Sequence, residues 1–252
     1  MNLADWHQRY LQQSQWTAAV RRHLFESVGL VSGDQVLEVG CGTGAVMSRL
    51  ARETSFDLFG IDIDHANLAF AARENETFRL AGADGHLLPF PDNAFDVVFC
   101  HYLLLWVANP AQILAEMRRV TRPAGAVMAL AEPDHAGRID SPPPLDQLGK
   151  LQTQALAAQS ADVTLGRKLR GLFHEAGLAN VTSGLLGAEW DSETEPDPSE
   201  WQVLEDDLKG FVNPVMLGSF KATDNQAREK GNRVLFIPTF YAIGWNSKQK
   251  IS

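Results

Sequence analysis

Glycines gather in one short segment of the chain, Gly40-Cys41-Gly42-Thr43-Gly44, which directly follows the apolar stretch 36–39. Glycine at alternate positions lets the backbone turn tightly and approach a ligand with no Cβ in the way. A helix that starts after such a turn also presents free N–H groups to the ligand. The segment therefore indicates a nucleotide site, although a structural tight turn would use the same residues. The type of nucleotide stays open, because Gly40, Gly42 and Ala45 also match the dinucleotide pattern G-x-G-x-x-G/A.

Two acidic residues follow at positions that suit the rest of a nucleoside. Asp62 ends the next apolar stretch, about twenty residues beyond the glycines, where a carboxylate can accept hydrogen bonds from both ribose hydroxyls. The alternative role, the N-cap of a helix, suits Asp64 better. Asp84 and Gly85 follow a third apolar stretch, where a carboxylate can accept from an adenine amino group and a glycine lets the loop close on the base. Alone, an Asp-Gly pair is a routine turn signal.

An alternation of short apolar strands and amphipathic helices must position these residues. Five strands separated by helices of about 10–15 residues indicate right-handed β-α-β units and a parallel sheet. Two further strands are expected beyond residue 132, and Pro238 in the second of them predicts a bulge or irregular pairing. The predicted fold is α/β, with a doubly wound, mostly parallel seven-stranded sheet of Rossmann-like type and helical insertions. The predicted strands are 36–39, 57–61, 78–81, 95–100, 126–131, 180–190 and 233–245.

The length of 252 residues predicts a single large domain. Residues 1–30 are expected to form a helical cover, in which apolar residues spaced by four from Trp16 to Val28 indicate a helix. Residues 35–132 would form the half that binds the cofactor, and residues 133–252 a substrate-side half with an insertion at 191–232. Within that insertion Ser199 and Gln202 have the spacing of a capping box.

The composition argues against several classes of protein. There are 22 Lys and Arg against 31 Asp and Glu, and nine of these acids lie between Glu189 and Asp207. Such a balance disfavours a large phosphate-neutralising surface, so we expect no nucleic-acid partner. No apolar run approaches the about 20 residues of a membrane span, and the start lacks the features of a signal peptide. Free thiols are expected at the two cysteines, which indicates a cytoplasmic protein. Together with the acidic charge balance, this favours a protein that acts on a small molecule.

The run from Val36 to Pro133 resembles the class I S-adenosylmethionine-dependent methyltransferases, in particular the group similar to the ubiquinone/menaquinone C-methyltransferases. Four stretches carry the resemblance in the right order and spacing. One departure is Pro123-Ala124-Gly125, where the family usually has Pro-Gly-Gly, a change in a turn that does not touch the cofactor. The matching stretches are VLEVGCGTG (36–44), GIDID (60–64), ADGHLLPFPDNAFDVVFC (83–100) and EMRRVTRPAG (116–125).

The resemblance implies S-adenosylmethionine as the cofactor and a role for each matching residue. The glycine segment would line its methionine end, Asp62 would hold the ribose with Ile63 against the adenine, and Asp84 with Gly85 would contact the adenine amino group. The backbone at Cys100 and His101 would face the cofactor amino group, and Gln15-Trp16 could close over the site. No metal site is predicted. The implied cofactor-binding residues are Glu38, Gly40, Cys41, Gly42, Gly44, Asp62, Ile63, Asp84, Gly85, Cys100 and His101.

Direct transfer from the sulfonium mainly requires an acceptor held in line and protected from water, since orientation can supply about 7–11 kcal/mol of the barrier. A base matters only when the acceptor arrives protonated. Polar residues at the ends of strands four and five could be that base, and His101 is the first choice because it lies closest to the cofactor. Oxygen, nitrogen and carbon acceptors all stay open. The candidate bases are His101, Glu132, Asp134 and His135.

Two other functions stay open. A non-catalytic protein that binds the same cofactor, or a protein partner, could keep the fold. An NAD-dependent oxidoreductase is disfavoured, because Glu38 and the pair Asp84-Gly85 have no role in hydride transfer. Aromatic residues of the variable segments either line an acceptor pocket or pack the insertion onto the sheet. These are Trp106, Trp190, Trp201, Phe211 and Phe220. The oligomeric state is not indicated.

Overall fold

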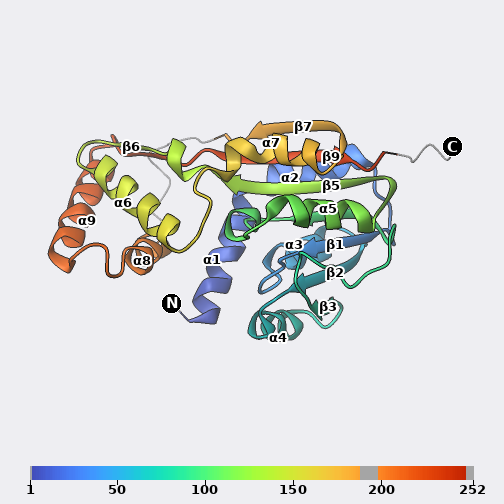
Figure 1. Cartoon of the computed structure of the whole chain (residues 1–252). Coiled ribbons are helices and arrows are strands. Elements are labelled where there is room, and N and C mark those ends of the chain that lie inside the picture. Colours follow the sequence, from blue (N-terminus) through green and yellow to red (C-terminus); the bar gives the residue numbers. More distant parts are fainter. Residues whose placement is uncertain (1, 188–197, 248–252) are drawn as a thin grey trace.

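One seven-stranded sheet runs through the protein in the order β3-β2-β1-β4-β5-β9-β7 (Figure 1). The computed structural model describes residues 2–187 and 198–247. The first five strands pair in parallel, and β9 runs antiparallel to both of its neighbours, so the prediction of a mostly parallel seven-stranded sheet is confirmed. The strands are β1 Gln35–Val39, β2 Asp57–Asp62, β3 Arg79–Gly82, β4 Phe95–Cys100, β5 Thr121–Pro133, β7 Ala179–Leu185 and β9 Thr239–Trp245.

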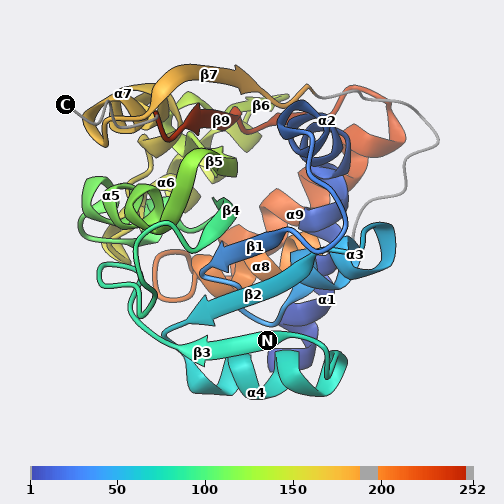
Figure 2. The ribbon, with the colours of Figure 1, turned by 90° about the vertical axis from the view of Figure 1, so that its right-hand side faces the viewer.

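Helices cover both faces of this sheet (Figure 2). The side chains of β4 alternate between the two apolar layers: Val98 and Cys100 enter one, while Val97 and Phe99 enter the other. The first layer is covered by α5 Pro110–Val120 and α7 Leu165–Glu175. The second is covered by α2 Ala18–Val28, α3 Ala45–Glu53 and α4 His65–Glu74. Burial on both faces explains why the strand sequences are almost continuously apolar.

Three predicted elements have different bounds in the structure. The predicted helix that ends before Gly29 is confirmed as α2 Ala18–Val28, but it starts after Thr17, because Trp16 already ends α1 Leu3–Trp16. The predicted strand 233–245 is two strands, β8 Val234–Phe236 and β9, which are interrupted at Ile237 and Pro238. The irregularity expected at Pro238 is thus confirmed. The predicted strand 180–190 is β7, and its residues 188–190 lie outside the described residues.

The end of the molecule beyond β5 is built from helices and a second, two-stranded sheet of β6 Ile139–Ser141 and β8. Its helices are α6 Leu145–Ala158, α8 Pro198–Asp207 and α9 Pro214–Glu229 (Figure 1). Trp201 and Phe220 are buried with leucines of α6 in a separate apolar cluster, so these two aromatics pack the insertion. Trp190 lies outside the described residues, and the side chain of the predicted cap residue Ser199 is not described either.

A buried carboxylate ties this helical end together. Asp224 on α9 is 2% exposed and accepts hydrogen bonds from Arg228 Nε at 2.8 Å and from Trp201 Nε1 at 3.1 Å. Arg233 Nε donates to its other oxygen at 2.5 Å, and Arg233 Nη2 also donates to Asp140 on β6 at 2.8 Å. Since Arg233 is itself almost fully buried, the two carboxylates compensate a cation that has little access to water.

Replacing Asp224 by Ala should lower the free energy of unfolding by about 3–5 kcal/mol, because it leaves Arg233 buried with only one of its two carboxylates. Chemical denaturation measures this loss. The matched control is Asp146→Asn, which removes the exposed pair of Asp146 and Lys150 on α6 and should leave the stability unchanged. Equal stabilities for the two variants would contradict a structural role of the buried network.

Candidate functional site

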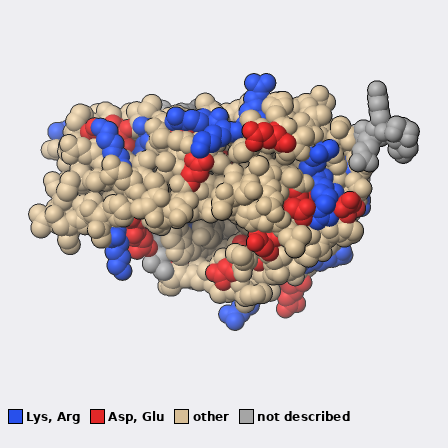
Figure 3. Space-filling model, in the orientation of Figure 1, with Lys and Arg blue, Asp and Glu red and all other residues tan. Residues whose placement is uncertain are grey.

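A cavity of about 840 Å³ lies at the edge of the sheet where the parallel strands reach their carboxyl ends, the edge at which open α/β sheets bind ligands. The surface is hollowed between α1 and the helical insertion (Figure 3). One end of the cavity is formed by the glycine segment and the ends of β1, β2 and β4. Six of the predicted site residues line it: Glu38, Gly40, Cys41, Gly42, Asp62 and His101.

The glycine segment bends through left-handed backbone conformations, with φ of 72° at Gly40 and 51° at Gly42. A Cβ built on Gly40 would lie 2.7 Å from the Leu103 side chain, so this position is closed by packing. A Cβ on Gly42 would meet only the Tyr10 ring, at 4.0 Å, and would project into the cavity. Gly42 is therefore the position where the absence of a side chain leaves room for a ligand.

Asp62 fixes this segment and also lines the cavity. Its Oδ2 accepts from the Gly42 N–H at 2.7 Å, and its Oδ1 accepts from the Asp64 N–H at 2.9 Å. A carboxylate has about four lone-pair sites, so hydrogen-bonding capacity remains for a ligand. Asp64 caps α4 by accepting from the Ala66 N–H, as predicted. Ile63 is 73% exposed beside them, outside the cavity lining.

Glu38 presents an acceptor without a protein partner to the same end of the cavity. It is almost fully buried on β1, and its Oε2 has no hydrogen-bond partner among the described residues. Burial raises the pKa of Glu38 well above its usual value, and the nearby Arg21 guanidinium opposes this shift. Arg21 is 1% exposed and donates to the Ser14 carbonyl at 2.8 Å. A ligand group that donates hydrogen bonds would satisfy the free oxygen of Glu38.

His101, the predicted base, lines the cavity with its ring held by a neighbour. Its Nε2 lies 3.2 Å from Thr17 Oγ1, and that hydroxyl donates its proton to the Ser14 carbonyl at 3.2 Å. The His101 ring is therefore within hydrogen-bonding distance of the residue that joins α1 to α2. Burial lowers the pKa of His101 to about 3, with a further contribution from the charge of Arg21. The ring is therefore uncharged.

Glu132, another candidate base, organises the main chain after β4. It is 0% exposed; its Oε1 accepts from the N–H groups of Leu103 and Leu104 at 3.0 Å each, and its Oε2 accepts from Leu105 at 3.3 Å. These residues enter the short helix η1 Leu104–Trp106, which brings Leu105 and Trp106 to the cavity. Burial raises the pKa of Glu132 to about 7, although the three N–H donors act in the opposite direction and lower it. Both oxygens are engaged with the backbone.

The structure does not bring all the predicted residues to the cavity. Asp84 is exposed and accepts from the N–H and the ring of His86, and its pKa is lowered mainly by these bonds. Gly85 packs closely on Val39 and Ile113. The Cys100 thiol is buried 3.9 Å from Glu132, and its pKa is raised by burial. The predicted residues outside the cavity lining are Gly44, Ile63, Asp84, Gly85 and Cys100.

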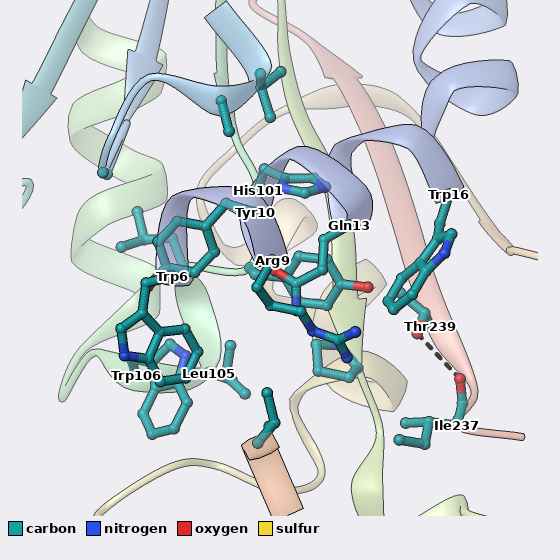
Figure 4. A pocket seen from close by; sticks show the side chains of 18 of the residues that line it. Trp6, Arg9, Tyr10, Gln13, Trp16, His101, Leu105, Trp106, Ile237 and Thr239 are labelled. Carbon is teal, nitrogen blue, oxygen red and sulfur yellow. Dashed lines mark hydrogen bonds between the residues drawn. The ribbon is translucent and has the colours of Figure 1, made fainter. Parts of the chain in front are cut away.

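Helix α1 covers the cavity (Figure 4), and most of the residues with which it lines the cavity were not predicted from the sequence. His7 Nδ1 lies 2.8 Å from Thr43 Oγ1, and Arg49 of α3 donates to Ser14 and to Gln15, which attach α1 over the glycine segment. The side chains that face the cavity follow a spacing of three and four residues, which marks one face of a helix and could have been found. They are Trp6, Arg9, Tyr10, Gln13 and Trp16.

A metal centre is not part of this arrangement: no three His, Cys, Asp or Glu side chains in the described ranges form a group that could hold an ion. Likewise, none of the described helices is long and apolar enough to span a membrane. The lining of the cavity combines polar side chains, such as Asp62, Gln152 and Asp207, with aromatic ones, such as Tyr10 and Trp106. It can therefore offer a ligand both hydrogen bonds and contacts with aromatic rings.

Comparison with known proteins agrees with this geometry. Residues 37–129 match the family described as methyltransferase domain. Demethylmenaquinone methyltransferase of Tropheryma whipplei is 35% identical over 138 residues, which make up 53% of this chain and 54% of that protein. Malonyl-(acyl-carrier protein) O-methyltransferase of Serratia marcescens is 33% identical over 96 residues, which make up 38% of this chain and 37% of that protein. The chain thus spans about half the length, or less, of these relatives.

A solved structure gives the same fold. Phosphoethanolamine N-methyltransferase 2 of Haemonchus contortus, in complex with phosphomonomethylethanolamine and S-adenosylhomocysteine, superposes with a TM-score of 0.57 at 13% identity. The match covers 87% of this chain and 50% of that one. The sheet is therefore that of the Rossmann-like methyltransferase fold.

Replacing Glu132 by Gln should lower the free energy of unfolding by about 1–3 kcal/mol, because the amide nitrogen cannot accept the hydrogen bond of a buried N–H. The exposed Glu175 of α7 provides the control, since Glu175→Gln makes the same side-chain replacement at the surface and should cost nothing. Thermal unfolding of both variants measures the difference. A Glu132→Gln protein as stable as the control would contradict the role assigned to this carboxylate.

Proposed function

Since residues 37–129 form a methyltransferase domain, we propose that the cavity binds S-adenosylmethionine and that the protein transfers its methyl group to a small molecule. One observation carries the proposal: the glycine segment, Asp62 and the unpartnered oxygen of Glu38 line the same end of one cavity. We further propose that residues 1–252 act as a single methyltransferase domain, with 1–30 as a cover and 191–232 as an insertion.

The residues present fit this cofactor. Gly42 has no side chain where a Cβ would point toward the cavity, so a methionine chain can lie against the backbone there. Asp62 would accept from the ribose hydroxyls, and the free oxygen of Glu38 would accept from the ammonium group. Ile63, Asp84 and Gly85 lie beyond the cavity lining, and we propose them as adenine contacts on the strength of the resemblance alone.

The bound cofactor would supply a methyl group on a sulfonium, which is electrophilic enough for direct transfer. The protein then has to hold the acceptor in line and exclude water. Helix α1 covers the site with Trp6, Tyr10 and Trp16, and η1 adds Trp106 (Figure 4). Glu132 keeps η1 in place by binding its first N–H groups. These residues would fix the acceptor by shape and would leave little room for water.

We also propose that the acceptor is a small molecule rather than a nucleic acid, and that the protein is cytoplasmic. Lys and Arg side chains are scattered over the face that carries the hollow (Figure 3), whereas a nucleic-acid site gathers them. Both cysteines are free and buried, which suits a reducing compartment. The proteins named above are a demethylmenaquinone methyltransferase, a malonyl-(acyl-carrier protein) O-methyltransferase and a phosphoethanolamine N-methyltransferase, so their names alone do not select one acceptor atom.

Asp62→Ala should weaken the binding of S-adenosylmethionine and S-adenosylhomocysteine at least tenfold, because hydrogen bonds to a charged group contribute about 1.5–3 kcal/mol each. Isothermal titration calorimetry measures both affinities. Asp64→Asn is the matched control, since asparagine also caps helices and residue 64 does not line the cavity. An unchanged affinity of Asp62→Ala would refute the ribose assignment; no binding to the wild-type protein would refute the proposed function.

Gly42→Ala should lower the cofactor affinity more than tenfold, because the new methyl group would occupy the cavity next to the glycine segment. Gly29→Ala is the control: Gly29 ends α2 with φ 71°, and nothing lies within 4 Å of a Cβ built there. Both substitutions place alanine in the left-handed region and should cost similar stability, about 1–2 kcal/mol. Equal cofactor affinities of the two variants would show that Gly42 does not face the ligand.

A further inference from the structure

The buried polar network of the helical end reaches the cavity at one carboxylate. Arg233 donates to Asp140 on β6, and Asp140 also accepts from Arg138, whose side chain is 4% exposed. Arg138 in turn donates to the side-chain oxygen of Gln152 on α6. Because arginine cannot accept a hydrogen bond, the amide nitrogen of Gln152 faces away from Arg138, and it donates to Asp207 Oδ2 at 2.7 Å. The network thus ends at Asp207, which lines the cavity together with Gln152.

The guanidinium groups of this network are all matched by carboxylates other than Asp207. Each of three arginines forms an ion pair with at least one of three acidic residues. Within the described ranges Asp207 forms no ion pair, and the group that donates to its side chain is the uncharged amide of Gln152. Asp207 therefore adds a negative charge that the network does not balance. The paired residues are Arg138, Arg228 and Arg233 with Asp140, Glu200 and Asp224.

Arg9 of α1 also lines the cavity (Figure 4), but it does not form an ion pair with Asp207. Its Nη1 donates to Gln12 on the same helix at 3.0 Å. The charge of Arg9 lowers the pKa of Asp207, although less than the hydrogen bond from Gln152 does. The direct partner of the carboxylate is therefore an amide and not a cation.

The two histidines of the lining add no positive charge. Burial lowers the pKa of His101 to about 3 and the pKa of His135 to about 4, so both rings are uncharged at neutral pH. Asp134, which precedes His135 and lies outside the cavity lining, is paired with Arg167, whose Nη2 donates to it at 2.7 Å. Neither histidine can therefore serve as the counter-ion of a carboxylate at the cavity wall.

The surroundings of Asp207 disfavour its negative charge in the empty cavity. Burial raises the pKa of Asp207, and the neighbouring charge of Asp206 raises it as well. Asp207 is also the last residue of α8, where the partial negative charge of the helix end adds to its own. Its Oδ1 accepts from no described residue, so this oxygen is available to a ligand. A cation that donates to Oδ1 would relieve this accumulation of negative charge, since hydrogen bonds between charged groups are the strong ones.

We propose that Asp207 binds a positively charged amino group of the methyl acceptor, which makes the acceptor a small amine. The proposal rests on the methyl transfer proposed above, and it adds the class of the acceptor and the residue that selects it. The ammonium group donates to Oδ1 of Asp207, while Gln152 holds Oδ2 and thereby fixes the plane of the carboxylate.

The test compares the binding of three amines with that of alcohols of the same shape. The pairs are benzylamine and benzyl alcohol, 2-phenylethylamine and 2-phenylethanol, and tryptamine and tryptophol; their rings suit a lining that includes Tyr10 and Trp106. At neutral pH the amines are cations, whereas the alcohols are uncharged but still donate a hydrogen bond. A difference in affinity within a pair therefore reports the charge.

Calorimetry first measures S-adenosylhomocysteine binding to the wild-type protein, to Asp207→Asn and to the control Asp206→Asn. The control removes the same charge from an exposed residue one position earlier on α8, outside the cavity lining. Failure of the wild-type protein to bind would refute the proposed function itself. Equal affinities of the three proteins show that the variants are folded and that the cofactor end of the cavity is intact.

With the site saturated with S-adenosylhomocysteine, the wild-type protein and Asp206→Asn should bind at least one amine about tenfold tighter than its alcohol, or more. Asp207→Asn should lose this preference, because asparagine keeps the size of the side chain and an oxygen for Gln152 but not the charge. Its affinity for the alcohol should stay within about threefold of the wild-type value, a result that a general disturbance of the cavity would not give.

Two results would overturn the inference while the cofactor still binds. If the wild-type protein prefers none of the three amines to its alcohol, the acceptor class is wrong. If Asp207→Asn keeps the preference of the wild-type protein, another group selects the amine and the role of Asp207 is wrong.

Discussion

The site depends on one buried carboxylate at the end of the central parallel strands. Glu132 closes β5, and its oxygens accept from three consecutive N–H groups that follow β4. These bonds join the ends of two neighbouring strands and fix the short helix η1. His101, Leu105 and Trp106, all on that stretch of chain, line the cavity as a consequence. A buried carboxyl group that accepts mainly from main-chain donors thus positions residues of the cavity without lining it.

The N-terminal cover and the insertion are held in place by different kinds of contact. Helix α1 is held by polar contacts, such as His7 to Thr43 and Arg49 to Ser14, next to the glycine segment. The insertion is held by an apolar cluster around Trp201 and by the buried network of Asp224 and Arg233. Both elements contribute polar as well as apolar side chains to the cavity, such as Arg9 and Trp6 of α1 and Asp207 and Val203 of α8.

Site residues could be predicted from the sequence where their position depends on neighbours close in the chain, and not where it depends on distant segments. Gly42 and Asp62 were identified because a tight turn and a strand end have local patterns, and the structure joins them by a hydrogen bond. Trp6 and Tyr10 could have been found from helical spacing. The break at Thr17 could not, because apolar spacing continues across it from Trp16 to Val20.

Side-chain roles were harder to predict than positions. Glu132 and His101 were correctly placed at strand ends, but their engagement by backbone N–H groups and by Thr17 depends on contacts between distant segments. Sequence spacing carries no information on which of several polar neighbours is left without a partner. Pro238 is the converse case, because a residue without an N–H limits pairing wherever the strand lies, and the break there was predicted.

The most direct test of the account is a crystal structure of the protein with S-adenosylhomocysteine. The account predicts that the amino acid end lies against Gly42 with its ammonium group on Glu38, that the ribose lies on Asp62, and that the sulfur faces the open part of the cavity. A ligand bound outside this cavity, or bound in it with no contact to Asp62 and Glu38, would contradict the account.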